Sequence, residues 1–356
     1  MALVSTCALS TPPRGYGGTE LVVAELSRAL QQLGHRPIVF ATGDSTCVGA
    51  REALFAHPVW PVDRLAELRH AGASWAQIAA DEFDVVHVNA PEALPFTSFV
   101  PLPTVATIHH ERGVALLAHY AAYPDVSYVA ISHRQAELAW EMPFRAVIHH
   151  GVDPSRYAAG EGGPRFAFLG RLAPEKGPHL AIEAARRLRV PLVLGGEPQA
   201  AHQEYFQRYV APALVPGITW AGELDQQAKI ELVAGSRALL FPIQWEEPFG
   251  LVMIESMLTG TPVIAYACGA APEVVEDGVT GFLVHTLDEM CRRMRDVASI
   301  DRKVCRARAQ ERWSAARMAR DYVALYLEAI DHFGTIRAPF GLPAGADEAT
   351  LAHSHR

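Results

Sequence analysis

Short apolar runs alternate regularly with helix-like segments along this chain. Each apolar run has the length of a strand and contains few polar residues, which is typical of strands that are buried on both faces. Strands and helices that alternate in this way predict parallel sheets covered by helices on both sides. Because the pattern occurs twice, we predict an α/β fold with two Rossmann-like, doubly wound parallel-sheet domains that face each other across a cleft.

The predicted elements fall into two sets. Strands are expected at 3–9, 37–41, 85–89, 104–109, 128–131 and 146–150, and then at 165–169, 192–194, 218–221, 238–241, 262–266 and 282–284. Helices are expected at 19–33, 63–80, 112–123 and 133–141, and then at 179–188, 204–214, 226–235, 250–258 and 287–298.

A stretch rich in glycine separates the two sets. Residues 151–163 contain four glycines and one proline and show no apolar periodicity, which is typical of a linker. We therefore predict an N-terminal domain over 1–155 and a C-terminal domain over 156–313. A long helix over 314–333 would cross back to the first domain, and residues 334–356 would form a mobile tail.

Composition narrows the class of protein. The 356 residues suffice for two domains, and the net charge of −8 disfavours general binding to nucleic acid. No apolar run is long enough to span a bilayer, and the N-terminus lacks the basic region of a signal peptide. Five scattered cysteines without a CxxC pair indicate a reducing compartment and argue against a structural zinc site. We expect a cytoplasmic protein without a strong membrane signal; the oligomeric state is not indicated.

One strand end carries an unusual combination of groups. The apolar strand pattern at 238–241 leads through Glu247-Pro-Phe-Gly into a helix-like run. The N–H groups of its first turn, at Gly250, Leu251 and Val252, would attract an anion such as phosphate. Glu247 precedes this turn and Glu255 follows two turns later, so a ligand with both phosphate and hydroxyl groups would fit. Helix capping by one glutamate and hydration of the other remain an alternative explanation.

A second turn, at 12–20, is rich in glycine. Gly17 and Gly18 would let the backbone approach a ligand closely, and Thr19 could cap the following helix. A dinucleotide-binding loop is disfavoured because the third small residue is missing and the loop is too long. A plain glycine turn without a ligand remains possible.

A third turn, at 168–177, brings two cations to one loop. Arg171 offers a planar fork and Lys176 a compact charge, and together they suit a diphosphate. The alternative explanation is that both cations are simply hydrated, as cations in loops usually are.

Histidines occur in pairs at two predicted strand ends, at 109–110 and 149–150. A histidine at the end of a strand usually serves only as a structural polar group. For His109, a polar contact is an equal alternative to that structural role. Two pairs could also bind a metal, but the periodicity supplies no further ligand, so we expect no metal. The segment 268–284 is expected to contribute packing rather than chemistry.

Taken together, these motifs resemble the retaining, nucleotide-sugar-dependent glycosyltransferases of family 4, which have the GT-B fold. The resemblance covers roughly residues 1–330. Its motifs are Gly-Gly-Thr-Glu from Gly17, Gly-Arg-Leu-Ala-Pro-Glu-Lys-Gly from Gly170, Glu-Pro-Phe-Gly-Leu-Val-Met-Ile-Glu from Glu247, Gly-Thr-Pro-Val-Ile-Ala from Gly260 and Glu-Asp-Gly-Val-Thr-Gly-Phe-Leu-Val from Glu276. The first motif, as Gly-Tyr-Gly-Gly-Thr-Glu, also resembles bacterial members associated with antibiotic and surface-sugar assembly.

The resemblance implies how the donor phosphates are held. Arg171 and Lys176 would bind the diphosphate and stabilise it as the leaving group. The N–H groups of residues 250–252 would bind the same phosphates. Gly17 and Gly18 would let the backbone of the first domain approach the β-phosphate when the cleft closes.

The resemblance also implies roles around the nucleoside and the sugar. Glu255 would accept hydrogen bonds from the ribose, and the turn with Gly222 and Leu224 would line the nucleobase pocket. Glu247 would orient the transferred sugar, and His109 would lie near its reacting side.

The implied reaction is retaining transfer of a sugar from a nucleoside-diphosphate sugar, UDP favoured, to a hydroxyl group of a small-molecule or saccharide acceptor. No Asp-x-Asp occurs in the chain, so the transfer is expected to need no metal and no cofactor. Acceptor choice is expected from the loops 49–73, 91–103 and 111–120. The chain departs from the family at His149-His150, where Pro-Asn is common, and at 269–273, where Gly-Gly-x-Pro-Glu is common.

Two other functions stay open on the sequence. One is a catalytically silent GT-B protein that binds a nucleotide-sugar or a partner enzyme, which the intact motifs disfavour. The other is a different GT-B enzyme, such as a phosphorylase or a sugar epimerase. A phosphorylase would need a cofactor lysine, and the only late lysine, Lys303, lies in a charged helix.

Overall fold

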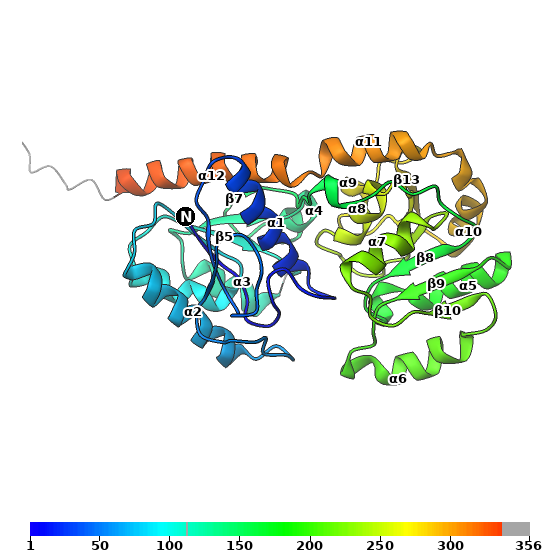
Figure 1. Cartoon of the computed structure of the whole chain (residues 1–356), viewed down its shortest axis with the longest axis horizontal. Coiled ribbons are helices and arrows are strands. Elements are labelled where there is room, and N and C mark those ends of the chain that lie inside the picture. The colour runs from blue at the N-terminus through cyan, green and yellow to red at the C-terminus, as the bar shows by residue number, and fades with distance from the viewer. Residues whose placement is uncertain (112, 337–356) are drawn as a thin grey trace, which may run out of the picture.

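In the computed structural model, the described residues, 1–111 and 113–336, form two parallel β-sheets (Figure 1). The strands of the first sheet are β1 (Ala2–Val4), β2 (Ile38–Ala41), β3 (Ala50–Glu52), β4 (Val86–Val88), β5 (Thr104–Ile108), β6 (Ser127–Ala130) and β7 (Phe144–Val147). Those of the second are β8 (Phe166–Leu169), β9 (Leu192–Gly195), β10 (Ile218–Trp220), β11 (Leu239–Phe241), β12 (Val263–Tyr266) and β13 (Gly281–Val284).

The strand order shows where each sheet can bind a ligand. The first sheet has the order β3-β2-β1-β4-β5-β6-β7 and the second the order β10-β9-β8-β11-β12-β13. In each sheet the strand order runs outward in opposite directions from one point, which lies between β1 and β4 in the first sheet and between β8 and β11 in the second. The loops at such a point diverge and leave space for a ligand. The predicted fold of two doubly wound domains is confirmed.

Helices cover both faces of the sheets. In the first half they are α1 (Gly18–Gln32), α2 (Arg64–Ala79), α3 (Val114–Ala121) and α4 (His133–Leu138). In the second they are α5 (Pro178–Leu188), α6 (Gln203–Tyr205), α7 (Gln226–Ala234), α8 (Leu251–Leu258), α9 (Ala271–Val274), α10 (Leu287–Asp296) and α11 (Arg302–Arg312), followed by α12 (Ala315–Ile336). Short 3-10 or π segments span Pro91–Ser98, Pro154–Arg156, Pro174–Lys176, Ala200–His202, Phe206–Val210, Ala211–Ala213 and Val297–Ser299.

The core of the first domain follows from the alternation of side chains along its strands. In β1, Leu3 packs on one side of the sheet with α1 and α12, whereas Ala2 and Val4 pack on the other side near α2. All three side chains are almost completely buried. A strand that is buried on both faces explains why the apolar runs of the sequence show no polar alternation.

Some predicted elements were wrong in extent. Strand β3 was not predicted, because it is a polar edge strand that pairs only with β2. Strand β1 ends at Val4, well before residue 9, and the chain then bends. The helix predicted over 204–214 is broken into α6 and short π and 3-10 turns, with Pro212 in the last of them, where it cannot donate a helical hydrogen bond.

The long helix α12 leaves the second domain and lies along the first (Figure 1). Two tyrosines of α12 pack against the sheet beside α1. The Tyr326 hydroxyl lies 2.8 Å from Nδ1 of His87, and the Tyr322 hydroxyl lies 2.7 Å from Oγ1 of Thr107. Oγ1 of Thr107 in turn lies 2.8 Å from Nε2 of His87. This buried network ties the end of the chain to β4 and β5.

The predicted tail lies mostly outside the described residues, and α12 continues past residue 333 to Ile336. Among the helices of the described ranges, none has the length and apolar character needed to cross a bilayer.

We expect His87 to make folding sensitive to acid. Burial lowers the pKa of His87 to about 3, so the folded chain keeps this ring neutral while the unfolded chain protonates it near its ordinary value. The unfolded state then binds more protons, and the free energy of unfolding falls as the pH drops below the ordinary value toward about 3. Between about pH 7.5 and about pH 5.5, this residue should account for a loss of about 1.4 kcal/mol.

Urea titrations at the two pH values would measure this contribution. In His87→Gln, which keeps hydrogen-bonding atoms but does not titrate, the acid-induced loss of stability should be smaller by that amount. His57→Gln, at an exposed histidine, serves as the control and should leave the loss unchanged. Equal losses in the native chain and in His87→Gln would contradict the assignment.

Candidate functional site

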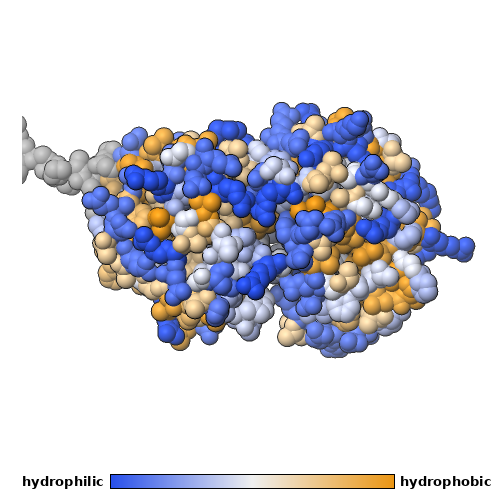
Figure 2. All heavy atoms as spheres, viewed as in Figure 1, coloured by the Kyte–Doolittle hydropathy of each residue, from blue (hydrophilic) through white to orange (hydrophobic). Residues whose placement is uncertain are grey.

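The carboxyl ends of both sheets open onto one cavity of about 670 Å³. Figure 2 shows the surface hollowed between the two lobes. Ligands of open parallel sheets bind at this edge. The cavity brings together nearly all of the residues that the sequence predicted, namely Gly17, Gly18, His109, Arg171, Lys176, Leu224, Glu247, Gly250, Leu251, Val252 and Glu255.

Gly222 is the exception, because it does not line the cavity. Its carbonyl accepts a hydrogen bond of 2.8 Å from the N–H of Gly196, which holds together the turns that follow β9 and β10. The next residues, Glu223 and Leu224, do line the cavity. Gly222 therefore supports the turn whose next residues line the cavity.

Helix α8 points its N-terminus into the cavity. Gly250 immediately precedes the helix with a φ of 87°, and no side chain caps the helix there. This φ favours glycine, and a Cβ atom at Gly250 would also lie 2.7 Å from Cε of Met253, so that side chain would have to shift. The first N–H groups of the helix are consequently left for an anion.

Lys176 and Glu247 form an ion pair inside the cavity. The indole N–H of Trp245 donates a hydrogen bond of 2.8 Å to Oε2 of the same carboxylate, and Nζ of Lys176 lies 4.7 Å from the centre of the indole ring. Trp245 thus fixes both partners of the pair, a contact that the sequence did not reveal. A phosphate at this place would compete with Glu247 for the lysine.

Arg171, in the same loop as Lys176, is also held by contacts with neighbouring side chains. Its guanidinium donates to Oε1 of Gln199 at 3.3 Å and lies 3.3 Å from Oε1 of Glu175. Its Nε is buried and has no hydrogen-bond partner among the described residues. A guanidinium with an unsatisfied donor beside a cavity is suited to a further acceptor from a ligand.

Glu255 lies deep in the cavity with only 5% of its surface exposed. One oxygen, Oε1, accepts hydrogen bonds from the Tyr157 hydroxyl at 3.1 Å and from Nε2 of Gln226 at 2.9 Å. Burial and the neighbouring carboxylate raise the pKa of Tyr157 well above its usual value, so the phenol remains a donor. The two donors orient Glu255 through one oxygen, and the other oxygen remains for a ligand.

His109 forms the floor of the cavity together with His150. The two rings stack with their centres 5.3 Å apart, and Nε2 of His109 lies 2.9 Å from Oδ1 of Asn89. Because Nδ2 of Asn89 donates to the Val4 carbonyl at 3.1 Å, Oδ1 is free to accept from His109. Burial, with His150 nearby, lowers the pKa of His109 well below its usual value, and burial lowers that of His150 to about 3. Both rings are therefore neutral at neutral pH.

The first domain contributes the start of α1 to the opposite side. A Cβ atom at Gly18 would lie 3.5 Å from Cδ1 of Leu251, so the two helix N-termini meet across the cavity. Gly17 immediately precedes α1, and its φ of 149° favours glycine. The predicted cap by Thr19 was wrong, because the helix begins one residue earlier and has no side-chain cap.

Exposed aromatic rings at the entrance also come from the first domain. Tyr16 and Trp60 line the cavity, and about half of the surface of each is exposed. The backbone N–H of Tyr16 donates 2.9 Å across the cleft to Oε1 of Glu223. Of the three predicted acceptor loops, the described lining includes a residue only from 49–73, namely Trp60.

In the segment 268–284, which was predicted to contribute packing rather than chemistry, Glu273 makes hydrogen bonds to the first domain. Both oxygens of Glu273 accept backbone N–H groups at the start of α4, from His133 at 2.8 Å and from Arg134 at 2.6 Å. The Arg134 guanidinium reaches the carboxylate of Glu246 with two hydrogen bonds of 2.9 Å. These contacts join the two domains beside the cavity.

Comparisons with known proteins agree with this geometry. A family model described as "Glycosyltransferase Family 4" matches residues 16–156, and one described as "Glycosyl transferases group 1" matches residues 153–312. A D-inositol 3-phosphate glycosyltransferase of Mycobacterium sp. (strain KMS) is 34% identical over 172 residues, which cover 41% of this chain. That match spans only 39% of the relative's own length.

Two further comparisons extend over most of the chain. A glycogen synthase of Mycobacterium tuberculosis is 27% identical over 330 residues, covering 76% of this chain and 79% of the relative. The crystal structure of AviGT4, a glycosyltransferase involved in avilamycin A biosynthesis, superposes with a TM-score of 0.70 at 25% identity. It covers 93% of this chain and 98% of AviGT4.

Proposed function

This chain belongs to glycosyltransferase family 4, and we propose on that basis that it transfers a sugar from a nucleoside-diphosphate sugar to a hydroxyl group of an acceptor. One observation carries the proposal. One cavity between two parallel sheets brings together the cations Arg171 and Lys176, an uncapped helix N-terminus and the carboxylates of Glu247 and Glu255, which lie in different surroundings. These groups have the chemistry that is needed to bind the phosphates, the ribose and the sugar of such a donor.

The departing diphosphate is the part of the donor that most needs stabilisation during the reaction. Negative charge grows on it as the bond between the anomeric carbon and the phosphate oxygen breaks. Donors and cations that are already in place stabilise this charge without reorganising. Arg171, Lys176 and the first N–H groups of α8 supply them from the second domain, and the backbone at Gly18 adds to them from the first.

Glu247 is proposed to orient the sugar rather than to transfer a proton. Its carboxylate is paired with Lys176 and accepts a hydrogen bond from Trp245, and these two contacts hold it beside the proposed phosphate site. A fixed negative charge there would shield the positive charge that develops at the anomeric carbon.

We propose that the transfer retains the anomeric configuration and needs no metal. The acceptor oxygen would attack from the face of the leaving group, and its proton would pass to the departing phosphate oxygen. The paired carboxylates of glycosidases are then not required. His109, neutral and held by Asn89, would contact the sugar at the cavity floor.

The nucleoside would lie at the inner end of the cavity. The free oxygen of Glu255 would accept hydrogen bonds from the ribose, and the turn at Glu223 and Leu224 would cover the base. UDP is the nucleotide that the family resemblance favours. The acceptor would enter past Tyr16 and Trp60, whose exposed rings suit the apolar face of a small molecule or a saccharide.

A thermal-shift panel tests the donor. A ligand that binds only the folded chain raises its melting temperature, so the sugar donor with the right nucleotide should give a clear rise among UDP-, GDP-, ADP- and dTDP-sugars. Glu255→Gln should reduce the rise for that donor, because the ribose loses a charged acceptor. Glu231→Gln, on the exposed side of α7, is the matched control and should leave the rise unchanged.

Nucleotide release then tests the reaction. The selected donor should release its nucleotide when an acceptor is added, also in the presence of EDTA. Because the relatives are named for inositol phosphate and glycogen, a polyol phosphate and a polysaccharide belong among the acceptors offered. If a donor raises the melting temperature but no donor releases nucleotide with any acceptor, a silent nucleotide-sugar-binding role would replace the proposal; if no donor does either, a partner role would replace it.

A further inference from the structure

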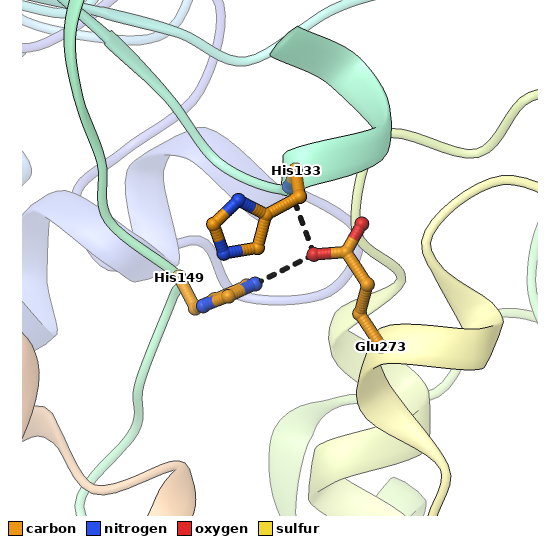
Figure 3. Close-up of side chains that lie close together, drawn as sticks. All are labelled: His133, His149 and Glu273. Atoms are coloured by element: carbon orange, nitrogen blue, oxygen red, sulfur yellow. Dashed lines mark hydrogen bonds and ion pairs between the residues drawn. The ribbon is translucent and has the colours of Figure 1, made fainter. Parts of the chain in front are cut away.

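A group of three potential metal ligands lies where the two domains meet, outside the cavity. It consists of His133 at the start of α4, His149 after β7 and Glu273 in α9. Figure 3 shows the two imidazole rings and the carboxylate gathered around one space. One ligand atom from each residue lies within 4.8 Å of the others. None of the three lines the cavity of the proposed reaction.

Existing contacts already hold two of the three ligands in place. Nε2 of His149 lies 2.8 Å from Oε2 of Glu273, and the His149 ring packs against Phe249 and Trp313 with ring centres 6.0 and 5.6 Å apart. Glu273 is fixed by the two N–H groups at the start of α4. The site therefore needs little ordering when an ion arrives.

His133 is the adjustable member. Its ring is exposed, lies 5.5 Å from the His149 ring, and makes no hydrogen bond among the described parts of the chain. A first-row metal bound at about 2.0–2.2 Å to each ligand separates neighbouring ligand atoms by about 3.3 Å. Small rotations of the exposed His133 ring and of the Glu273 carboxylate would bring the three atoms to that spacing.

We propose that His133, His149 and Glu273 bind a divalent transition metal of the Zn²⁺ class that ties the two domains together. Two imidazole nitrogens and one carboxylate oxygen form a ligand set that such ions favour, and a fourth position stays open to water. The ion would replace the hydrogen bond between His149 and Glu273 with bonds to both residues, and His133 would complete the set. Since two ligands come from the first domain and one from the second, the ion would stabilise the domain arrangement.

The sequence led us to expect no metal, because each histidine pair lacked a third ligand. That ligand set forms only in the fold: Glu273 is 124 residues away from His149 along the chain. The proposed site uses no cysteine, so the scattered cysteines do not argue against it. It is independent of the sugar transfer, for which no metal is proposed.

Zinc titration of the full chain tests the site. After removal of metals with a chelator, calorimetry should find one Zn²⁺ ion per chain at this site, and Zn²⁺ should raise the melting temperature. His133→Ala should weaken this binding at least about tenfold and abolish the rise, because one of three ligands is lost. This variant keeps the backbone N–H that bonds to Glu273, so it should fold normally; His149→Ala serves as a second variant.

Two controls separate this site from other histidines. His57→Ala, at an exposed histidine elsewhere, should bind Zn²⁺ like the native chain. The variant His353→Ala/His355→Ala removes the histidines near the end of the sequence and should keep the binding and the thermal effect. Binding that survives in both His133→Ala and His149→Ala, or that is lost only in the variant of the terminal histidines, would overturn the proposal.

Discussion

Glu247→Gln should lower kcat for sugar transfer by about 10²–10³-fold while UDP binds as tightly as before or more tightly. In the proposed mechanism, the carboxylate stabilises the sugar only as positive charge develops on it, so its loss acts on the transition state. In the ground state, Glu247 occupies Lys176, and its removal frees that cation for the phosphates. The rate of nucleotide release and calorimetry with UDP measure the two effects separately.

Glu246→Gln is the matched control, because it changes the adjacent carboxylate. That group faces Arg134 rather than the cavity and is bound to its guanidinium at 2.9 Å. The kcat of the Glu246→Gln variant should stay close to that of the native chain. If Glu247→Gln weakened UDP binding as much as it lowered kcat, Glu247 would be a ligand of the nucleotide, and its role in orienting the sugar would be wrong.

Lys176→Ala and Arg171→Ala should show the opposite behaviour and weaken UDP binding by about 10–100-fold each. A hydrogen bond from a charged donor contributes about 1.5–3 kcal/mol, which corresponds to that range. The loss should depend on the phosphates, so the much weaker affinity for uridine should remain the same in both variants. Calorimetry with UDP and competition experiments with uridine measure both ligands.

Arg187→Ala provides the control for the loss of a cation. Arg187 lies on α5 in exposed contacts with Glu183 and Asp288, away from the cavity lining. UDP binding to this variant should be unchanged. Equal weakening of UDP and uridine in Lys176→Ala would indicate that the cavity had collapsed instead of losing a phosphate ligand.

Local patterns in the sequence sufficed to predict most of the fold. Buried parallel strands need apolar residues on both faces, so β11 and β12 appear as continuous apolar runs. The edge strand β3 has no such requirement, and its sequence Ala-Arg-Glu carries no strand signal. Strand β1 ends early because tertiary contacts bend the chain after Val4, and such contacts leave no periodicity.

The cavity was predictable for a different reason. Residues that follow parallel strands gather at one edge of a sheet, so Arg171, Lys176 and the turn before α8 were expected at the same edge, and the structure shows that β8 and β11 are neighbours there. The supporting residues were not predictable. Tyr157 and Gln226 hold Glu255 from other parts of the chain, and Trp245 fixes Glu247, but an isolated tyrosine, glutamine or tryptophan carries no motif.

The order of strands, turns and helices along the chain was enough to predict the two doubly wound sheets, the family and most of the residues that gather in the cavity. Each of these depends on local order along the chain: strand, turn, helix. The contacts between the domains, where His149 meets Glu273 and Arg134 meets Glu246, were visible only in the folded structure. Such contacts depend on how two separately folded sheets pack and on the path of α12, and residues so distant in sequence share no local pattern.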